Sequence, residues 1–372
     1  MKGFIKGVLL TSLFFTVLVS CEKKKETEWT YEISGVRHSF LASYQLASQE
    51  HLNRGQVLQT KMNAFCVLPI VSRFNTVRDA WASSWNAYQY IKPFWYMSSE
   101  IDNPIGFDVN RIETWNFDPS YIDATVASPS AGIIVNPTMY PVISHANVNS
   151  WHTSVNSTLG YQVLEFLLWG EDNSVSSGGN RTHQDFISTS TTNDRRRTFL
   201  KASSDNFAEG FTAYFNESFE TEILIASNKE FMRFILSGLV DFLEEDFVGN
   251  TLRKPFLSQE PNDELSRYSE NTIIDIQNKI GALELILNGN GQFTSEVGYF
   301  LLDFINDVDG SLKSSIEVSI AEMHSAVESI QGNFDTALSS SIEMQKIEAL
   351  IMHAEALTLS LKEFAVQIKV EL

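Results

Sequence analysis

The chain has 372 residues, 43% of them hydrophobic, which is enough for one large domain or two of ordinary size with a proper core. Its formal net charge of -19 argues against nucleic acid as a partner, because binding phosphates needs clustered Lys and Arg. The only two cysteines are Cys21 and Cys66. Cys66 lies in an apolar run and is expected to be a small buried hydrophobe.

The first twenty residues have the pattern of a lipoprotein signal peptide. Lys2 and Lys6 precede an apolar stretch from Val8 to Val19, and Leu18-Val19-Ser20-Cys21 has the form of a lipobox. The stretch is too short to span a bilayer as a mature helix, and strongly polar residues follow it. We therefore predict a leader over residues 1–20, a lipid on Cys21 as the membrane anchor, and a polar tether over residues 21–31. The alternative is an ordinary signal peptide with a chance Cys.

Apolar side chains recur at helical spacing along most of the chain, and this predicts an all-α fold. We expect two packed antiparallel helical bundles, residues 32–222 and 223–372. Helical patterns cover residues 33–74, 77–97, 157–169, 195–225, 229–247, 265–287, 296–306, 312–331 and 347–368. Pro93 predicts a kink or a break near Lys92, and Gly132–Val135 is the one strand candidate.

Two segments do not have a helical pattern. Residues 102–149 carry five prolines among aromatic and aliphatic side chains, and residues 171–193 are rich in Ser, Thr and Gly. Irregular segments of this length are uncommon in compact domains and are usually functional or mobile. We expect the first to be a long irregular excursion over the N-terminal bundle and the second to be flexible. The aromatic-rich helix before them, residues 77–97, is expected to form core rather than to line a haem or glycan site.

The candidate site lies in the segment from Gly160 to Asp172. On a helix, Gln162 and Glu165 are three residues apart and share a face, whereas their neighbours Val163, Phe166 and Leu167 are apolar. A carboxylate beside so much apolar surface must be hydrogen-bonded or paired. A structural hydrogen bond is the simpler explanation, and a ligand site is the other.

This segment has the spacing of a family signature, Gly-x-His-x-x-Glu followed by an apolar-aromatic stretch and Gly-x-Asp. The matching residues are Gly160, Glu165, Phe166–Trp169, Gly170 and Asp172, and the flanking segments that fit are Ala80-Trp81, Ile112–Asp118, Tyr121–Asp123 and Arg195–Leu200. In their order these segments resemble the imelysin family, over roughly residues 35–290. That family includes imelysin-type metallopeptidases and iron-regulated bacterial envelope proteins.

The resemblance implies a site around Glu165, which would be the principal anionic or metal ligand. Gln162, Trp115, Asp118 and Arg196 would be its neighbours, and the cofactor stays open between a divalent metal ion and haem. However, Gln162 stands where the signature has His, and an amide oxygen is a much poorer ligand than imidazole for zinc, iron or copper. The pairs His324/Glu328 and His183/Asp185 are expected to be solvated rather than metal-binding.

No nucleophile elbow, phosphate-binding loop or dinucleotide fingerprint is present. The prediction is therefore a non-catalytic lipoprotein of the cell envelope, at the outer membrane on its periplasmic or surface face. The resemblance links it to iron or haem acquisition, with envelope iron-uptake components and the membrane as partners. The alternatives are an imelysin-type metallopeptidase with an atypical ligand set, and a surface-binding or glycan-handling lipoprotein that retains only the fold.

Overall fold

The computed structural model describes residues 8–99, 111–114, 117–153, 155–213, 217–291 and 297–372. Helices dominate these residues and none of them belongs to an extended strand, so the all-α prediction is confirmed. The helices are α1 (Val8–Val67), α2 (Val71–Ser99), α3 (Pro119–Ile122), α4 (His145–Trp151), α5 (Tyr161–Trp169), η2 (His183–Phe186), α6 (Thr191–Ala213), α7 (Glu217–Ile225), α8 (Asn228–Asp241), the π-helix η3 (Phe242–Arg253), α9 (Lys254–Ser258), η4 (Pro261–Asp263), α10 (Thr272–Asn288), α11 (Leu301–Val308), α12 (Gly310–Ser329), α13 (Phe334–Leu338) and α14 (Ser341–Gln367).

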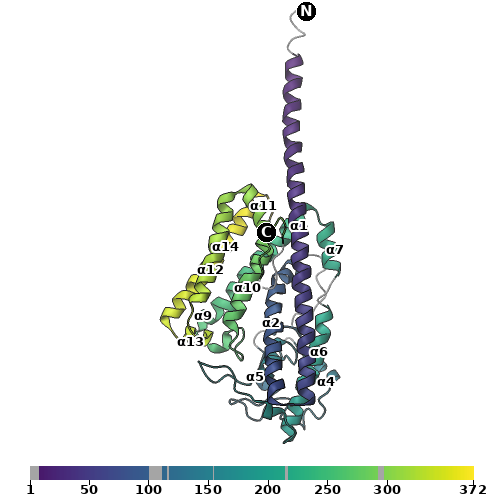
Figure 1. Ribbon diagram of the computed structural model, residues 1–372, viewed down its shortest axis with the longest axis vertical. Helices are drawn as coiled ribbons and strands as arrows, with labels where there is room; N and C mark the ends of the chain where they lie inside the picture. The colour runs from purple at the N-terminus through teal and green to yellow at the C-terminus, as the bar shows by residue number, and fades with distance from the viewer. Residues whose placement is uncertain (1–7, 100–110, 115–116, 154, 214–216, 292–296) are drawn as a thin grey trace, which may run out of the picture.

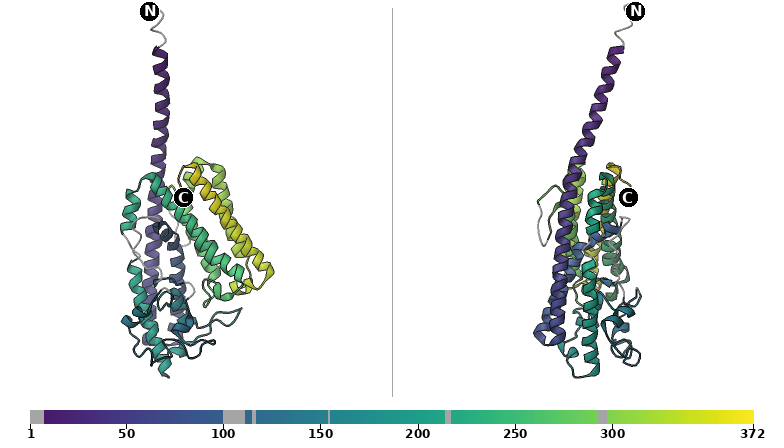
Figure 2. Two further views of the ribbon diagram at one scale, coloured as in Figure 1. Left: turned by 180° about the vertical axis from the view of Figure 1, so that it is seen from behind. Right: turned by 90° about the vertical axis from the view of Figure 1, so that its right-hand side faces the viewer.

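Two groups of long helices lie side by side (Figure 1). In the first, α1 packs along α2 and against α6, and the short helices α4 and α5 close one end. In the second, α12 packs along α14, and α10 and η3 complete the group. Helix α10 also packs on α2, so it joins the two groups. The left view of Figure 2 shows the same arrangement from behind, with the second group beside the first.

Helix α1 has 60 residues and is longer than the helical groups against which it packs. Ile33, Phe40, Tyr44 and Phe65 are among its buried side chains, but its N-terminal part extends beyond the other helices (Figures 1 and 2). Residues 8–20 of the predicted leader and residues 21–31 of the predicted tether belong to this helix. Across the described residues, no helix is both long and apolar enough to cross a membrane.

Several predicted boundaries were wrong for identifiable reasons. The pattern over residues 33–74 is divided at Pro69, which separates α1 from α2. Helix α2 in turn continues through Pro93 without a break. The strand candidate Gly132–Val135 is a turn, in which Ile133 and Ile134 donate backbone hydrogen bonds to Tyr121 and Ile122.

Two other segments also differ from their predictions. Helix α10 begins at Thr272 rather than at Leu265, because residues 264–271 form a turn. The polar segment 171–193 contains η2, whose Phe186 is fully buried against Phe65 and Phe74. That contact fixes the segment to the N-terminal bundle.

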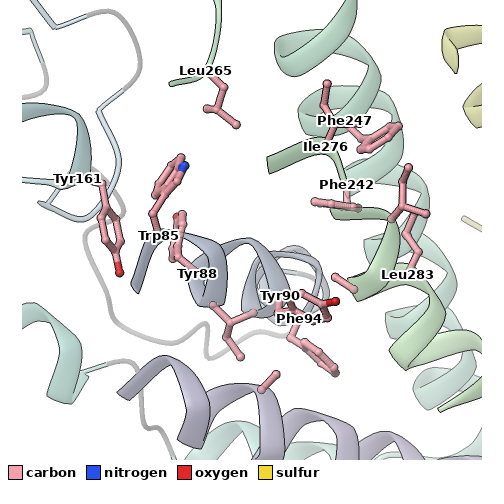
Figure 3. Close-up of a cluster of buried hydrophobic side chains, with 14 of the residues drawn as sticks. Trp85, Tyr88, Tyr90, Phe94, Tyr161, Phe242, Phe247, Leu265, Ile276 and Leu283 are labelled. Atoms are coloured by element: carbon pink, nitrogen blue, oxygen red, sulfur yellow. The ribbon is translucent and has the colours of Figure 1, made fainter. Parts of the chain in front are cut away.

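The aromatic residues of α2 form the core, as predicted. Trp85 and Tyr88 stack on each other with ring centroids 5.4 Å apart, and Tyr161 of α5 packs against both (Figure 3). Cys66 is partly buried against the same core, and burial raises the pKa of its thiol to about 12. The core thus connects α2 directly to the short helix that carries the signature.

Candidate functional site

Helix α5 is short, and its position is set by the glycines at its two ends. Gly160 has a φ of +104°, and a Cβ atom there would lie 2.9 Å from the carbonyl oxygen of Ile112. This close approach lets the Tyr161 N–H donate a 2.7 Å hydrogen bond to that same oxygen. Gly170 ends the helix with a φ of +80°, a conformation that suits glycine. The two signature glycines are therefore explained by backbone geometry.

Basic side chains hold the other end of α5. Arg78 donates a 2.8 Å hydrogen bond to the Leu168 carbonyl, and Arg181 donates a 3.1 Å bond to the Leu167 carbonyl. These carbonyls have no partner within the helix, and cations suit the negative end of the helix dipole. The helix is thereby fixed as a buried element.

Glu165 holds a turn that lies about a hundred residues further along the chain. Its Oε1 accepts hydrogen bonds from the backbone N–H of Tyr268 at 3.2 Å, and from the N–H and hydroxyl of Ser269 at 2.9 and 2.6 Å. The side chain is 1% exposed. Glu165 thus connects α5 to the turn that precedes α10.

The protonation of Glu165 follows from this burial. Burial raises the pKa of the carboxyl to about 8, although the hydrogen bonds from Ser269 act in the opposite direction. At neutral pH the group therefore keeps its proton for most of the time.

Gln162 lies on the same face and is also engaged with the backbone. Its Oε1 accepts a 3.1 Å hydrogen bond from the Thr114 N–H. Its buried Nε2 has no hydrogen-bond partner among the described residues. Gln162 and Glu165 line a cavity of about 10 Å³ together with Glu264, which is room for about one water molecule. The structure therefore brings the two predicted residues together, in a space too small for haem.

The other predicted neighbours lie elsewhere or outside the described residues. Asp118 is exposed and caps α3 by accepting from the N–H and hydroxyl of Ser120 at 2.8 and 2.7 Å. Arg196 donates a 2.7 Å hydrogen bond to the buried carboxylate of Asp123. Neither residue is among the described residues that line the cavity. Trp115 falls outside the described residues.

The pair does not suit the metal ion that the resemblance implies. The Gln162 oxygen and Glu165 Oε1 already accept hydrogen bonds from the backbone. A catalytic zinc site needs three protein ligands, usually with imidazole or thiolate among them. No His or Cys lines the described part of this cavity. The residues at this position therefore do not form a site for a catalytic metal ion.

Sequence reasoning missed the residues that surround the pair. Ser269 lies in the turn that the periodicity predicts to be helical, and Glu264 comes directly before that predicted helix, so their role could not be recognised. A buried ionic network was also missed, in which Lys92 contacts Glu113 and Asp246, and Lys279 contacts Asp246. The only available signal was the presence of lysines inside apolar helical patterns.

The protein is all-α, as predicted, with two packed helical groups. The buried helix that carries Glu165 lies in the first group, between two glycines with positive φ. The Imelysin family model matches residues 40–361, and the chain belongs to that family. A similar solved structure is that of an iron-regulated protein A precursor from Parabacteroides distasonis, at 13% sequence identity and a TM-score of 0.66. The match covers 90% of this chain and 95% of that one, and at this identity it shows the shared fold. No curated protein matches the chain.

Proposed function

We propose that this protein is a lipid-anchored, non-catalytic member of the Imelysin family that serves iron or haem acquisition in the cell envelope. The proposal that the protein is not an enzyme rests on one observation. Glu165 accepts hydrogen bonds from the backbone of the turn at Tyr268 and Ser269. Together with Gln162 in place of the signature His, it supports a structural role for the signature residues.

The envelope location and the link to iron have separate support. The lipobox at Leu18–Cys21 supports export and lipidation. The structurally similar protein is named as an iron-regulated precursor, and this name supports a related role here. The cavity at Gln162 is too small for haem, so a haem ligand would have to bind at another surface.

The non-catalytic part is tested with purified full-length protein and a panel of unstructured peptide substrates, with zinc and with a chelator. We expect no zinc-dependent cleavage in the wild type or in Glu165→Gln. Zinc-dependent cleavage that Glu165→Gln abolishes would support the metallopeptidase alternative and contradict this part of the proposal.

The physiological part is tested in the host. A strain lacking the gene should grow poorly when iron salts or haem are scarce, and the wild-type gene should restore growth. Growth equal to that of the parent strain under iron limitation would contradict the iron role and leave the glycan-handling alternative.

Lipidation is tested separately by mass spectrometry of the membrane-extracted protein. We expect a diacylated or triacylated Cys21 at the N-terminus, and a Cys21→Ala variant that fails to mature. A soluble protein with an unmodified N-terminus from normal cells would contradict the anchor.

A further inference from the structure

Three carboxylates from distant parts of the chain converge beside the signature helix. One oxygen from each of Asp172, Glu270 and Asp335 lies within 4.8 Å of the other two. Asp172 follows α5, Glu270 precedes α10, and Asp335 belongs to α13. The cluster therefore joins the signature segment to two elements of the C-terminal half.

Two of the carboxylates in this region are deeply buried and lack hydrogen-bond partners. Asp335 is 1% exposed and Glu264 is 4% exposed. No oxygen of Asp335, Glu264 or Glu270 accepts a hydrogen bond of normal geometry from a described residue. The side chains of Thr272 and Asn333 lie near Glu264 and Glu270 and act to lower their pKa values, but burial and the neighbouring carboxylates outweigh them. Glu264 is not one of the three clustered residues, but Asp335 and Glu270 act on it electrostatically. It adds a buried, unpartnered carboxylate to the same region.

These four groups also lack a counter-charge. No Lys or Arg in the described ranges forms an ion pair with Asp172, Glu264, Glu270 or Asp335. Burying unpaired charges is costly, so the groups must either keep protons or share a cation. Burial and mutual repulsion raise the pKa of Glu270 to about 8 and that of Asp335 to about 7. This is the behaviour of carboxyls that have no compensating positive charge.

The chemistry of the donors indicates the kind of cation. All of them are carboxylate oxygens, which suit hard cations, and neither imidazole nor thiolate belongs to the described group. Several carboxylates from different parts of the chain match Ca²⁺, which takes 6–8 oxygen ligands in adaptable geometry. Mg²⁺ demands stricter octahedral geometry and keeps more of its water.

We propose that Asp172, Glu270 and Asp335, with Glu264 beside them, form a binding site for a hard divalent cation, with Ca²⁺ as the best match. The three clustered carboxylates do not line the cavity of the Gln162/Glu165 pair, and Glu264 is the residue that lies between the two places. The proposal does not depend on the proposed function. The bound cation ties the segment after α5 to α13 and to the turn that Glu165 holds. Cation binding therefore stabilises the junction between the two halves of the fold.

The test uses the chelator-treated full-length protein at neutral pH, titrated calorimetrically with Ca²⁺, Mg²⁺, Mn²⁺ and Zn²⁺. We expect saturable Ca²⁺ binding with a Kd of about 10⁻⁴ to 10⁻³ M, the range of extracellular calcium modules, and a rise in melting temperature. Because affinity follows the number of charged ligands, Glu270→Gln and Asp335→Asn should each weaken binding by about tenfold or more.

A matched control is needed because the whole chain is acidic and binds cations weakly at its surface. Glu260→Gln removes the same charge from an exposed position four residues before Glu264 and should leave the affinity unchanged. Glu270 is only half-buried, so its Gln variant should fold, and circular dichroism checks this. The proposal is overturned by the absence of saturable binding, by equal affinity in Glu270→Gln and Glu260→Gln, or by a preference for Zn²⁺ over Ca²⁺.

Discussion

The Ser269 hydroxyl donates a 2.6 Å hydrogen bond to Oε1 of Glu165, and the Ser269 N–H donates a second bond to the same oxygen at 2.9 Å. The most distinctive acidic residue of the chain therefore fixes a turn of the backbone. The helix that carries Glu165 is packed under α2, and the turn leads into α10. Glu165 is thus part of the connection between the two halves of the fold.

Replacing Glu165 should reveal this structural role. Glu165→Ala removes the acceptor for the buried N–H groups of Tyr268 and Ser269, so we expect a loss of about 1–3 kcal/mol in the free energy of unfolding. Glu165→Gln keeps an oxygen in the same place and should lose less. Urea unfolding of the two variants beside the wild type measures the difference. Equal losses would show that the hydrogen bonds contribute little.

Stability should also depend on pH through this residue. The pKa of Glu165 is about 8 in the folded protein, above its ordinary value of 4.5, so the folded state binds the proton more tightly. The resulting stabilisation is fully present below the ordinary pKa and is lost as the pH rises through about 8. Glu264, Glu270 and Asp335 shift in the same direction.

We therefore expect the chelator-treated protein to lose stability between mildly acidic and mildly alkaline pH. Glu165→Gln should make this loss smaller without removing it, because the other carboxyls still titrate. Unfolding free energies across the pH range measure the slope, with Glu260→Gln as the exposed control. A slope that is the same in both variants would contradict the assignment to Glu165.

Restoring the signature His tests whether the position can be turned into a metal site. Gln162→His supplies an imidazole next to Glu165 and Glu264, which line the same cavity. We expect a measurable gain in zinc affinity over the wild type, lost again when Glu165→Ala is added. Calorimetry with zinc, iron and copper measures both steps. Micromolar or tighter binding by the wild type that Glu165→Ala abolishes would show that the unaltered position is already a metal site.

The helical elements near the signature could be predicted because their cause is local. Apolar spacing predicts the helix that ends at Trp169, although α5 begins at Tyr161 rather than at residue 157, and the shared face of Gln162 and Glu165 follows from its periodicity. The aromatic core on α2 follows in the same way. Hydrophobic periodicity depends on neighbours within one or two turns, so it is available from the sequence alone.

The partners of these residues could not be predicted because they are distant in sequence. Ser269 and Glu264 lie in a turn whose apolar residues Leu265 and Tyr268 continue the spacing of α10, so the pattern extends the helix too far. The convergence of Asp172, Glu270 and Asp335 depends on how three connecting segments meet. Composition and periodicity carry no information about such contacts.

The buried ionic network between the bundles provides the last test. Asp246 accepts hydrogen bonds from Lys92 of α2 and Lys279 of α10, and all three side chains are at least nine-tenths buried. Glu113 also pairs with Lys92, so the network holds two positive and two negative groups. Removing one member leaves an unpaired charge in the core, which costs more than the loss of the whole pair.

Asp246→Ala should therefore lower the free energy of unfolding by about 3–5 kcal/mol, because Lys279 loses its carboxylate partner. The double variant Asp246→Leu with Lys279→Met should lose less than Asp246→Ala alone, because Lys92 and Glu113 remain as a pair. The exposed pair Lys362/Glu244 is the matched control, and Lys362→Ala should cost no more than about 1 kcal/mol. Denaturant unfolding of the three variants measures these values. A double variant that is less stable than Asp246→Ala would mean that the charges themselves, rather than their balance, hold the two halves together.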